Sequence, residues 1–128
     1  MNLSRPSSSH GFSLVEMLVV IAVIGILSAV AVPQLGRIND ATNEAKDKRN
    51  AQNLASVFHS GEGAGLNLEG ADLNSTIDLI VAGGTVTEGV FAGQFFGVMG
   101  LSNEEQDKAA QYLEYSDGSL QYIGSNAP

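Results

Sequence analysis

One charged side chain, Glu16, stands within an otherwise uncharged apolar run from Gly11 to Pro33. A carboxylate in hydrocarbon costs about 3 kcal/mol unless it finds a partner or the interface. We therefore predict a functional role for Glu16, in which a cation compensates its charge. The alternative is a side chain that snorkels to the lipid headgroups.

Other reactive groups are scarce. The chain has no cysteine, which excludes a catalytic thiol and a cysteine metal site, and its only histidines are His10 and His59. The glycine-rich segment Ser60 to Gly65 lacks the lysine and hydroxyl residue of a phosphate-binding loop. Without a nucleophile elbow or a metal-binding histidine pair, the sequence predicts that the protein is not an enzyme.

The element that must position Glu16 is an apolar helix. Met17 to Val32 contains no charge, and Ser28 is its only polar side chain. At about 1.5 Å per residue, a helix from Phe12 to Val32 is about 31 Å long. That length matches the hydrocarbon core of a bilayer, about 30 Å thick. The segment 12–33 is therefore predicted to span a membrane.

The residues at its start, Gly11-Phe12-Ser13-Leu14-Val15-Glu16, resemble the type IV pilin and pseudopilin family. The resemblance implies that a membrane-embedded prepilin peptidase removes residues 1–11 by cutting after Gly11. It also implies N-methylation of the new terminal residue, Phe12, and places Glu16 fifth in the mature chain. Gly25 and Pro33 agree with many members of the family, and Pro33 falls where these helices often kink or loosen.

Cutting after Gly11 would supply a cation for Glu16. The new α-amino group of Phe12 is cationic near neutral pH, and Glu16 of an adjacent subunit could neutralise it in low dielectric. This pairing predicts an assembly role for Glu16. The expected partners are the prepilin peptidase, other pilin or pseudopilin subunits and the inner membrane.

The leader, residues 1–11, contains Arg5 and no acid, so the N-terminus is predicted to be cytoplasmic and the acidic remainder exported. His10 stands where the family usually has Lys or Arg, and we interpret it as a linker residue. A second interpretation remains open, because Ala29-Val30-Ala31 also fits the cleavage site of a conventional secretory signal.

After Pro33 the pattern becomes that of an amphipathic helix, residues 34–60. We predict one long helix from about Phe12 to Ser60, kinked or loosened at Pro33 and ended by Gly61 and Gly63. The mixed charges of 46–49 are interpreted as a solvated face rather than a partner-binding patch. Glu44 and Lys48 have the spacing of a helical ion pair.

The rest, residues 61–128, is predicted to be an acidic α+β head, so the fold class is α+β with a long N-terminal helix. A helix within Asp72 to Gly84 is expected to be capped by Asn74, Ser75 or Thr76 and to end at Gly83-Gly84, with a strand at 85–87. The stretch Val90 to Leu101 should pack against the long helix.

A capping box at Ser102 predicts a helix over 103–113, and Asp117-Gly118 predicts a hairpin over 114–123. The expected core is Leu54, Phe58, Ile80, Phe95, Phe96 and Leu113.

Charge limits the partners. The formal net charge is −8, and residues 61–128 hold ten acids and one base, Lys108. Binding of nucleic acid needs clustered Lys and Arg, so none is expected. No cofactor is predicted; calcium, which some members of the family bind, stays open, although no dense run of Asp, Asn and Gly has its ligand spacing.

Together these features predict a structural subunit of a type II secretion pseudopilus or of a type IV pilus-like filament. It would be a single-pass protein of the bacterial inner membrane whose head is periplasmic or part of a surface filament. The alternative is a membrane-anchored exported protein that does not assemble into a filament.

Overall fold

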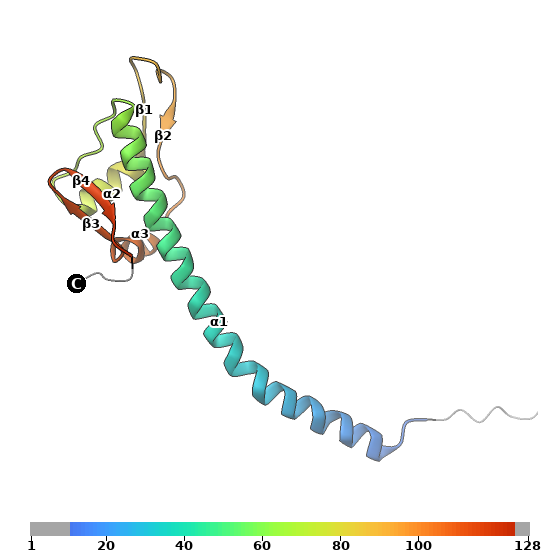
Figure 1. The fold of residues 1–128 in the computed structure, drawn as a ribbon. Helices are drawn as coiled ribbons and strands as arrows, with labels where there is room; N and C mark the ends of the chain where they lie inside the picture. The colour runs from blue at the N-terminus through green and yellow to red at the C-terminus, as the bar shows by residue number, and fades with distance from the viewer. Residues whose placement is uncertain (1–10, 125–128) are drawn as a thin grey trace, which may run out of the picture. The chain divides into compact units, whose positions relative to one another are not determined.

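The computed structural model describes residues 11–124, and the chain divides into two compact units, Met1–Asp40 and Ala41–Pro128. A single helix, α1 (Leu14–Gly63), belongs to both units (Figure 1). Its assignment continues without a break through Pro33. The kink at Pro33 therefore stays a prediction, and the leader lies outside the described residues except for Gly11.

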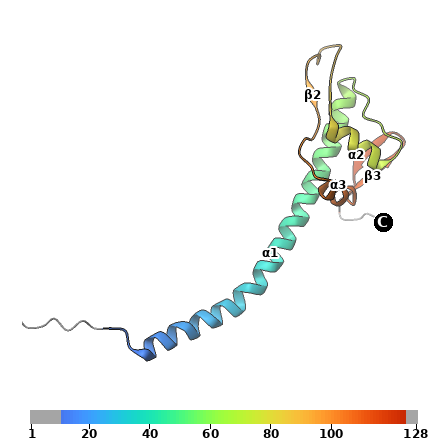
Figure 2. The ribbon, with the colours of Figure 1, turned by 180° about the vertical axis from the view of Figure 1, so that it is seen from behind.

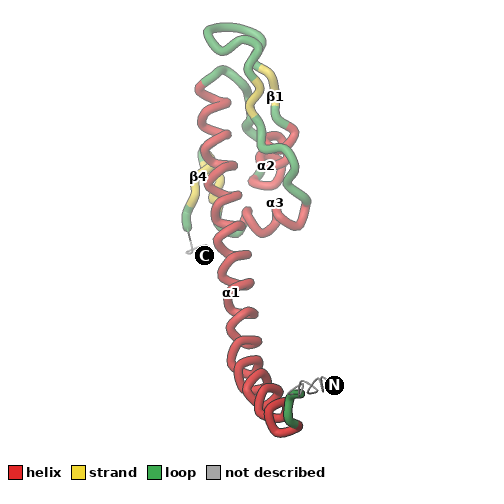
Figure 3. The backbone as a smooth tube through the Cα atoms, turned by 90° about the vertical axis from the view of Figure 1, so that its right-hand side faces the viewer, coloured by secondary structure: helices red, strands yellow, loops and turns green. Residues whose placement is uncertain are grey.

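The C-terminal unit, Ala41–Pro128, contains the rest of the regular structure, and the α+β prediction is confirmed. The two short hairpins lie on either side of the C-terminal part of α1 (Figure 3). Both are antiparallel and two-stranded. The elements after α1 are α2 (Leu73–Ala82), β1 (Gly84–Thr85), β2 (Phe95–Phe96), α3 (Asn103–Ala110), β3 (Leu113–Ser116) and β4 (Ser119–Tyr122).

The hydrophobic core of this unit forms around one face of α1. The helix buries five residues at three- and four-residue spacings, as an amphipathic helix should. The prediction that Phe95 belongs to the core is wrong, because Phe95 is 48% exposed. Phe96, also expected in the core, is half-buried. Four of the expected core residues are buried, namely Leu54, Phe58, Ile80 and Leu113, joined by Ala51, Ala55, Leu68, Ile77, Ala109 and Leu120.

The ends of α1 differ from the prediction. The helix begins at Leu14 rather than Phe12 and runs through Gly61 to Gly63. Gly61 is buried inside the helix, and a Cβ there would lie 2.6 Å from Cδ1 of Leu68. Close packing against Leu68 thus explains this glycine better than helix termination does.

The helix α2 is capped by Asp72, so the three expected cap residues are wrong. Asp72 Oδ1 accepts from the Ser75 N–H and from the Ser75 hydroxyl, both at 2.7 Å. Asp72 lies before the three candidates, and its extended backbone lets the carboxylate reach forward to the N–H of Ser75 in the first turn. The expected end at Gly83 is confirmed, with φ at 67°.

The capping box and the C-terminal hairpin are confirmed. Ser102 caps α3, although the helix ends at Ala110 because Leu113 already begins β3. In the turn between β3 and β4, Asp117 and Gly118 have φ values of 52° and 70°, the left-handed pair that a tight two-residue hairpin requires.

The stretch Val90 to Leu101 packs as predicted only in part. A Cβ on Gly61 of α1 would lie 3.6 Å from Cβ of Phe96, and Val98 packs against the core. Val90 is 95% exposed and Met99 75% exposed. This stretch closes a hairpin with β1, in which the Val86 N–H donates to Gln94 O and the Gly93 N–H donates to Val86 O. The loop of this hairpin, which contains Val90, extends beyond the C-terminal end of α1 (Figures 1 and 2).

Candidate functional site

The peptide bond between Gly11 and Phe12 is open to solvent. Residues 11–13 have no regular secondary structure, and Phe12 is 83% exposed. A Cβ built on Gly11 would meet nothing within 4 Å, so packing within the chain does not require glycine there. An exposed, irregular bond next to a helix is the geometry that a peptidase needs.

Glu16 belongs to a capping box at the start of α1. The Ser13 N–H donates to Glu16 Oε2 at 2.8 Å, and the Glu16 N–H donates to Ser13 Oγ at 3.1 Å. Ser13 O accepts the first helical bond, from the Met17 N–H. Our sequence interpretation missed this role, which the Ser-x-x-Glu pattern before an apolar run would have revealed.

The side chains around Glu16 are apolar. Glu16 lines a hollow of about 400 Å³ together with Phe12, Val15, Met17, Val19 and Val20. Every residue from 11 to 46 is exposed, and α1 is long and apolar enough to cross a membrane. The capping box thus satisfies part of the carboxylate's hydrogen-bonding capacity, while no cation of the described residues compensates its charge.

The remaining candidate groups do not form a catalytic or metal site in the described part of the chain. His10 lies outside it, and His59 is exposed, with its ring edge-on to Phe58 at 5.4 Å. Residues 11–124 contain no group of three or more His, Cys, Asp or Glu that could hold a metal. A cleft of about 290 Å³ between α2 and α3 is lined by Asn74, Ile77, Asp78, Asn103, Gln106 and Asp107.

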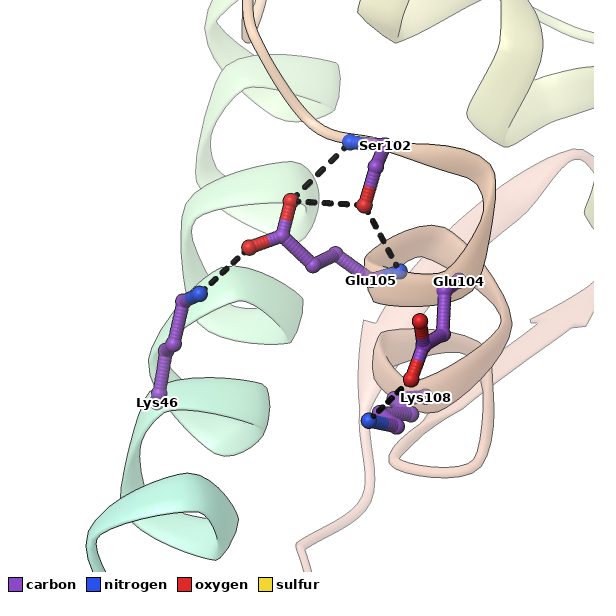
Figure 4. A network of polar contacts seen from close by, with 5 residues as sticks. All are labelled: Lys46, Ser102, Glu104, Glu105 and Lys108. Carbon is purple, nitrogen blue, oxygen red and sulfur yellow. Dashed lines mark hydrogen bonds and ion pairs between the residues drawn. The ribbon is translucent and has the colours of Figure 1, made fainter.

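The charged cluster 46–49 takes part in the fold. Lys46 forms an ion pair with Glu105 of α3, whose carboxylate also accepts from the Ser102 N–H at 3.0 Å (Figure 4). Lys48 pairs with Glu44 at 2.7 Å, as predicted, and lies over the ring of Tyr112. Both lysines remain in contact with solvent, as predicted for the cluster. The contact of Lys46 with α3 and that of Lys48 with Tyr112 could not be predicted from residue spacing along α1.

We predict that Glu105 makes the stability of the C-terminal unit sensitive to acid. The hydrogen bond from Lys46, together with those from Ser102, lowers the pKa of Glu105 from 4.5 to about 2. A depressed carboxylate pKa contributes stability above the unfolded pKa, and this contribution is lost as the pH falls through the folded one. Thermal unfolding of the full chain in detergent, followed by tyrosine near-UV circular dichroism, should show the loss between pH 4.5 and about 2.

Glu105→Gln should weaken this acid dependence. Glu114→Gln is the matched control, because Glu114 is exposed and forms no ion pair with the described residues. Equal acid dependence in the two variants would contradict the role of Glu105.

Comparison with known proteins identifies the class of the N-terminal segment. Residues 6–32 match the family model of the prokaryotic N-terminal methylation motif, the signature of the prepilin-type segment of type IV pilins and pseudopilins. The predicted resemblance is therefore confirmed for this segment. No curated protein and no solved structure matches the chain.

The motif supports a type IV pilin-like processed subunit. It characterises a structural pilin-type segment rather than an enzyme class, and it implies processing by a prepilin peptidase and assembly with other pilin subunits. Together with the single apolar N-terminal helix, it is consistent with anchoring in the inner membrane.

Proposed function

We propose that the chain is a structural subunit of a type II secretion pseudopilus or a type IV pilus-like filament, assembled through its N-terminal helix. The observation that carries the proposal is the carboxylate of Glu16, which lies two residues inside an exposed apolar helix and is the fifth residue after the bond at which we expect cleavage. Such a helix exposes side chains that only lipid or other helices can cover.

The proposed contact joins Glu16 of one subunit to the α-amino group of Phe12 of the next. A carboxylate has about four acceptor sites, and the bond from Ser13 uses one of them. An ammonium group could therefore bind Glu16 without breaking the capping box. Because both charges lie among apolar side chains, each would compensate the cost of burying the other.

The proposed orientation follows from charge. The N-terminus is cytoplasmic, the apolar part of α1 crosses the inner membrane once, and the acidic C-terminal unit is exported. Arg5 is the basic residue before the span, and ten of the fourteen acids lie in residues 61–128.

Substitution of Glu16 tests the proposal. Because the chain has no cysteine, Leu27→Cys provides a single thiol in the apolar helix for cross-linking between copies in cells. Glu16→Ala should leave membrane insertion intact and lower this cross-linking at least about tenfold, since removing one partner of a buried ion pair is strongly destabilising. Quantified cross-linked dimer and extracted membrane fractions are the two readouts.

Glu16→Gln separates the charge from the cap. Glutamine can still accept from the Ser13 N–H in a capping box, but it cannot neutralise an ammonium group. We expect it to assemble as poorly as Glu16→Ala. If adding Glu16→Gln to Leu27→Cys leaves the cross-linking unchanged, Glu16 serves only as a cap. If Leu27→Cys with Glu16 intact does not cross-link, the chain is an exported anchor that does not assemble.

A further inference from the structure

Among the described residues of the C-terminal unit, the exposed large apolar side chains all come from the part of the chain between residues 79 and 99. These side chains belong to α2, to the hairpin of β1 and β2, and, for Met99, to the segment between β2 and α3. A contiguous patch of exposed apolar groups on a soluble unit marks an interaction surface. This surface, which we call the hairpin patch, consists of Leu79, Val90, Phe91, Phe95 and Met99.

The hairpin patch is held in place by the backbone. The ring of Phe95 lies against Gly83 and Gly97, and a Cβ on Gly97 would approach its Cζ to 2.9 Å. Main-chain hydrogen bonds fix the loop, including that from the Gln94 N–H to Phe91 O at 3.0 Å. A surface ordered before binding loses little conformational freedom when it is covered.

The same segment carries almost no charge. Residues 83–103 contain one charged residue, Glu88, whereas residues 61–128 hold ten acids and one lysine. Two such acidic surfaces repel each other at separations within the Debye length, about 8 Å at physiological salt. The hairpin loop extends beyond the end of α1 (Figures 1 and 2), so a contact made there keeps most of the acidic surface apart.

We infer that the hairpin patch binds a second copy of this chain. An apolar surface is its own complement, and because this patch carries almost no charge, two copies can meet there without bringing like charges together. The strands β1 and β2 each have a sheet neighbour on one side only, which leaves main-chain groups at the ribbon's edges for the copy. The inference rests on the proposed function, because it assigns the contact between C-terminal units of assembled subunits.

Single cysteines in the full chain test this contact in cells. Val90→Cys places a thiol in the hairpin patch, and Gln121→Cys places one on the exposed face of the other hairpin. With a short thiol cross-linker, Val90→Cys should give the dimer of this chain and Gln121→Cys little of it. Adding Phe91→Glu to Val90→Cys should lower the yield about tenfold or more, because an unpaired carboxylate is costly to bury.

The cross-link from Leu27→Cys distinguishes the two proposals. If Leu27→Cys links copies but Val90→Cys gives no more dimer than Gln121→Cys, the inference fails and the proposed function stands. If Val90→Cys links instead to a different protein, identified by mass spectrometry, the patch binds another partner and the inference also fails. If neither site links, assembly itself is refuted and the inference with it.

Discussion

Gly11→Leu should abolish removal of the leader. The bond after Gly11 is exposed and lies outside α1, and a Cβ at Gly11 would meet no atom of residues 13–124 within 4 Å. The substitution should therefore leave the fold unchanged and act only on the peptidase, whose site a bulky side chain would crowd. Intact mass should show a wild-type chain that begins at Phe12 and carries one methyl group, and a variant that begins at Met1.

Gly25→Leu is the matched control for this prediction. A Cβ on Gly25 also meets nothing within 4 Å, but Gly25 lies inside α1, far along the chain from the bond. We expect normal cleavage of this variant. A wild-type mass that begins at Val32 would instead establish a conventional secretory signal at Ala29-Val30-Ala31, and a wild type that begins at Met1 would refute both forms of processing.

Phe58→Ala should destabilise the C-terminal unit more than any surface change. Phe58 is 2% exposed, and its ring meets that of Tyr115 edge-on at 6.5 Å. Replacing a buried phenylalanine by alanine costs about 3–5 kcal/mol, a large part of the 5–15 kcal/mol that stabilises a typical domain. At about 4–8 °C per kcal/mol for a unit of this size, the midpoint of thermal unfolding should fall by at least about 12 °C.

The three tyrosines of the chain, at 112, 115 and 122, all lie in the C-terminal unit. Near-UV circular dichroism of the full chain in detergent therefore follows this unit alone. Phe91→Ala removes the same side chain from an exposed position and should change the midpoint little. Similar midpoints for Phe58→Ala and the wild type would show that the core does not depend on the contact between α1 and the elements around it.

The local pattern of residues was enough to predict much of this protein. An uncharged run of membrane length predicts an apolar helix wherever it stands, because the cost of exposing it to water depends on composition alone. The Ser102 cap and the Asp117-Gly118 turn depend on hydrogen bonds and φ values within four residues, so both could be predicted. The motif around Gly11, Phe12 and Glu16 is equally local, and the family match confirms the segment.

Only the tertiary structure decided which apolar side chains are covered. Phe95 and Phe96 are neighbours in a strand, yet one is half exposed and the other partly buried, because successive residues point to opposite faces. The burial of Gly61 depends on Leu68, and the pairing of Lys46 depends on Glu105, fifty-nine residues away. Contacts over such separations depend on how distant elements pack against each other, which no short spacing of residue types encodes.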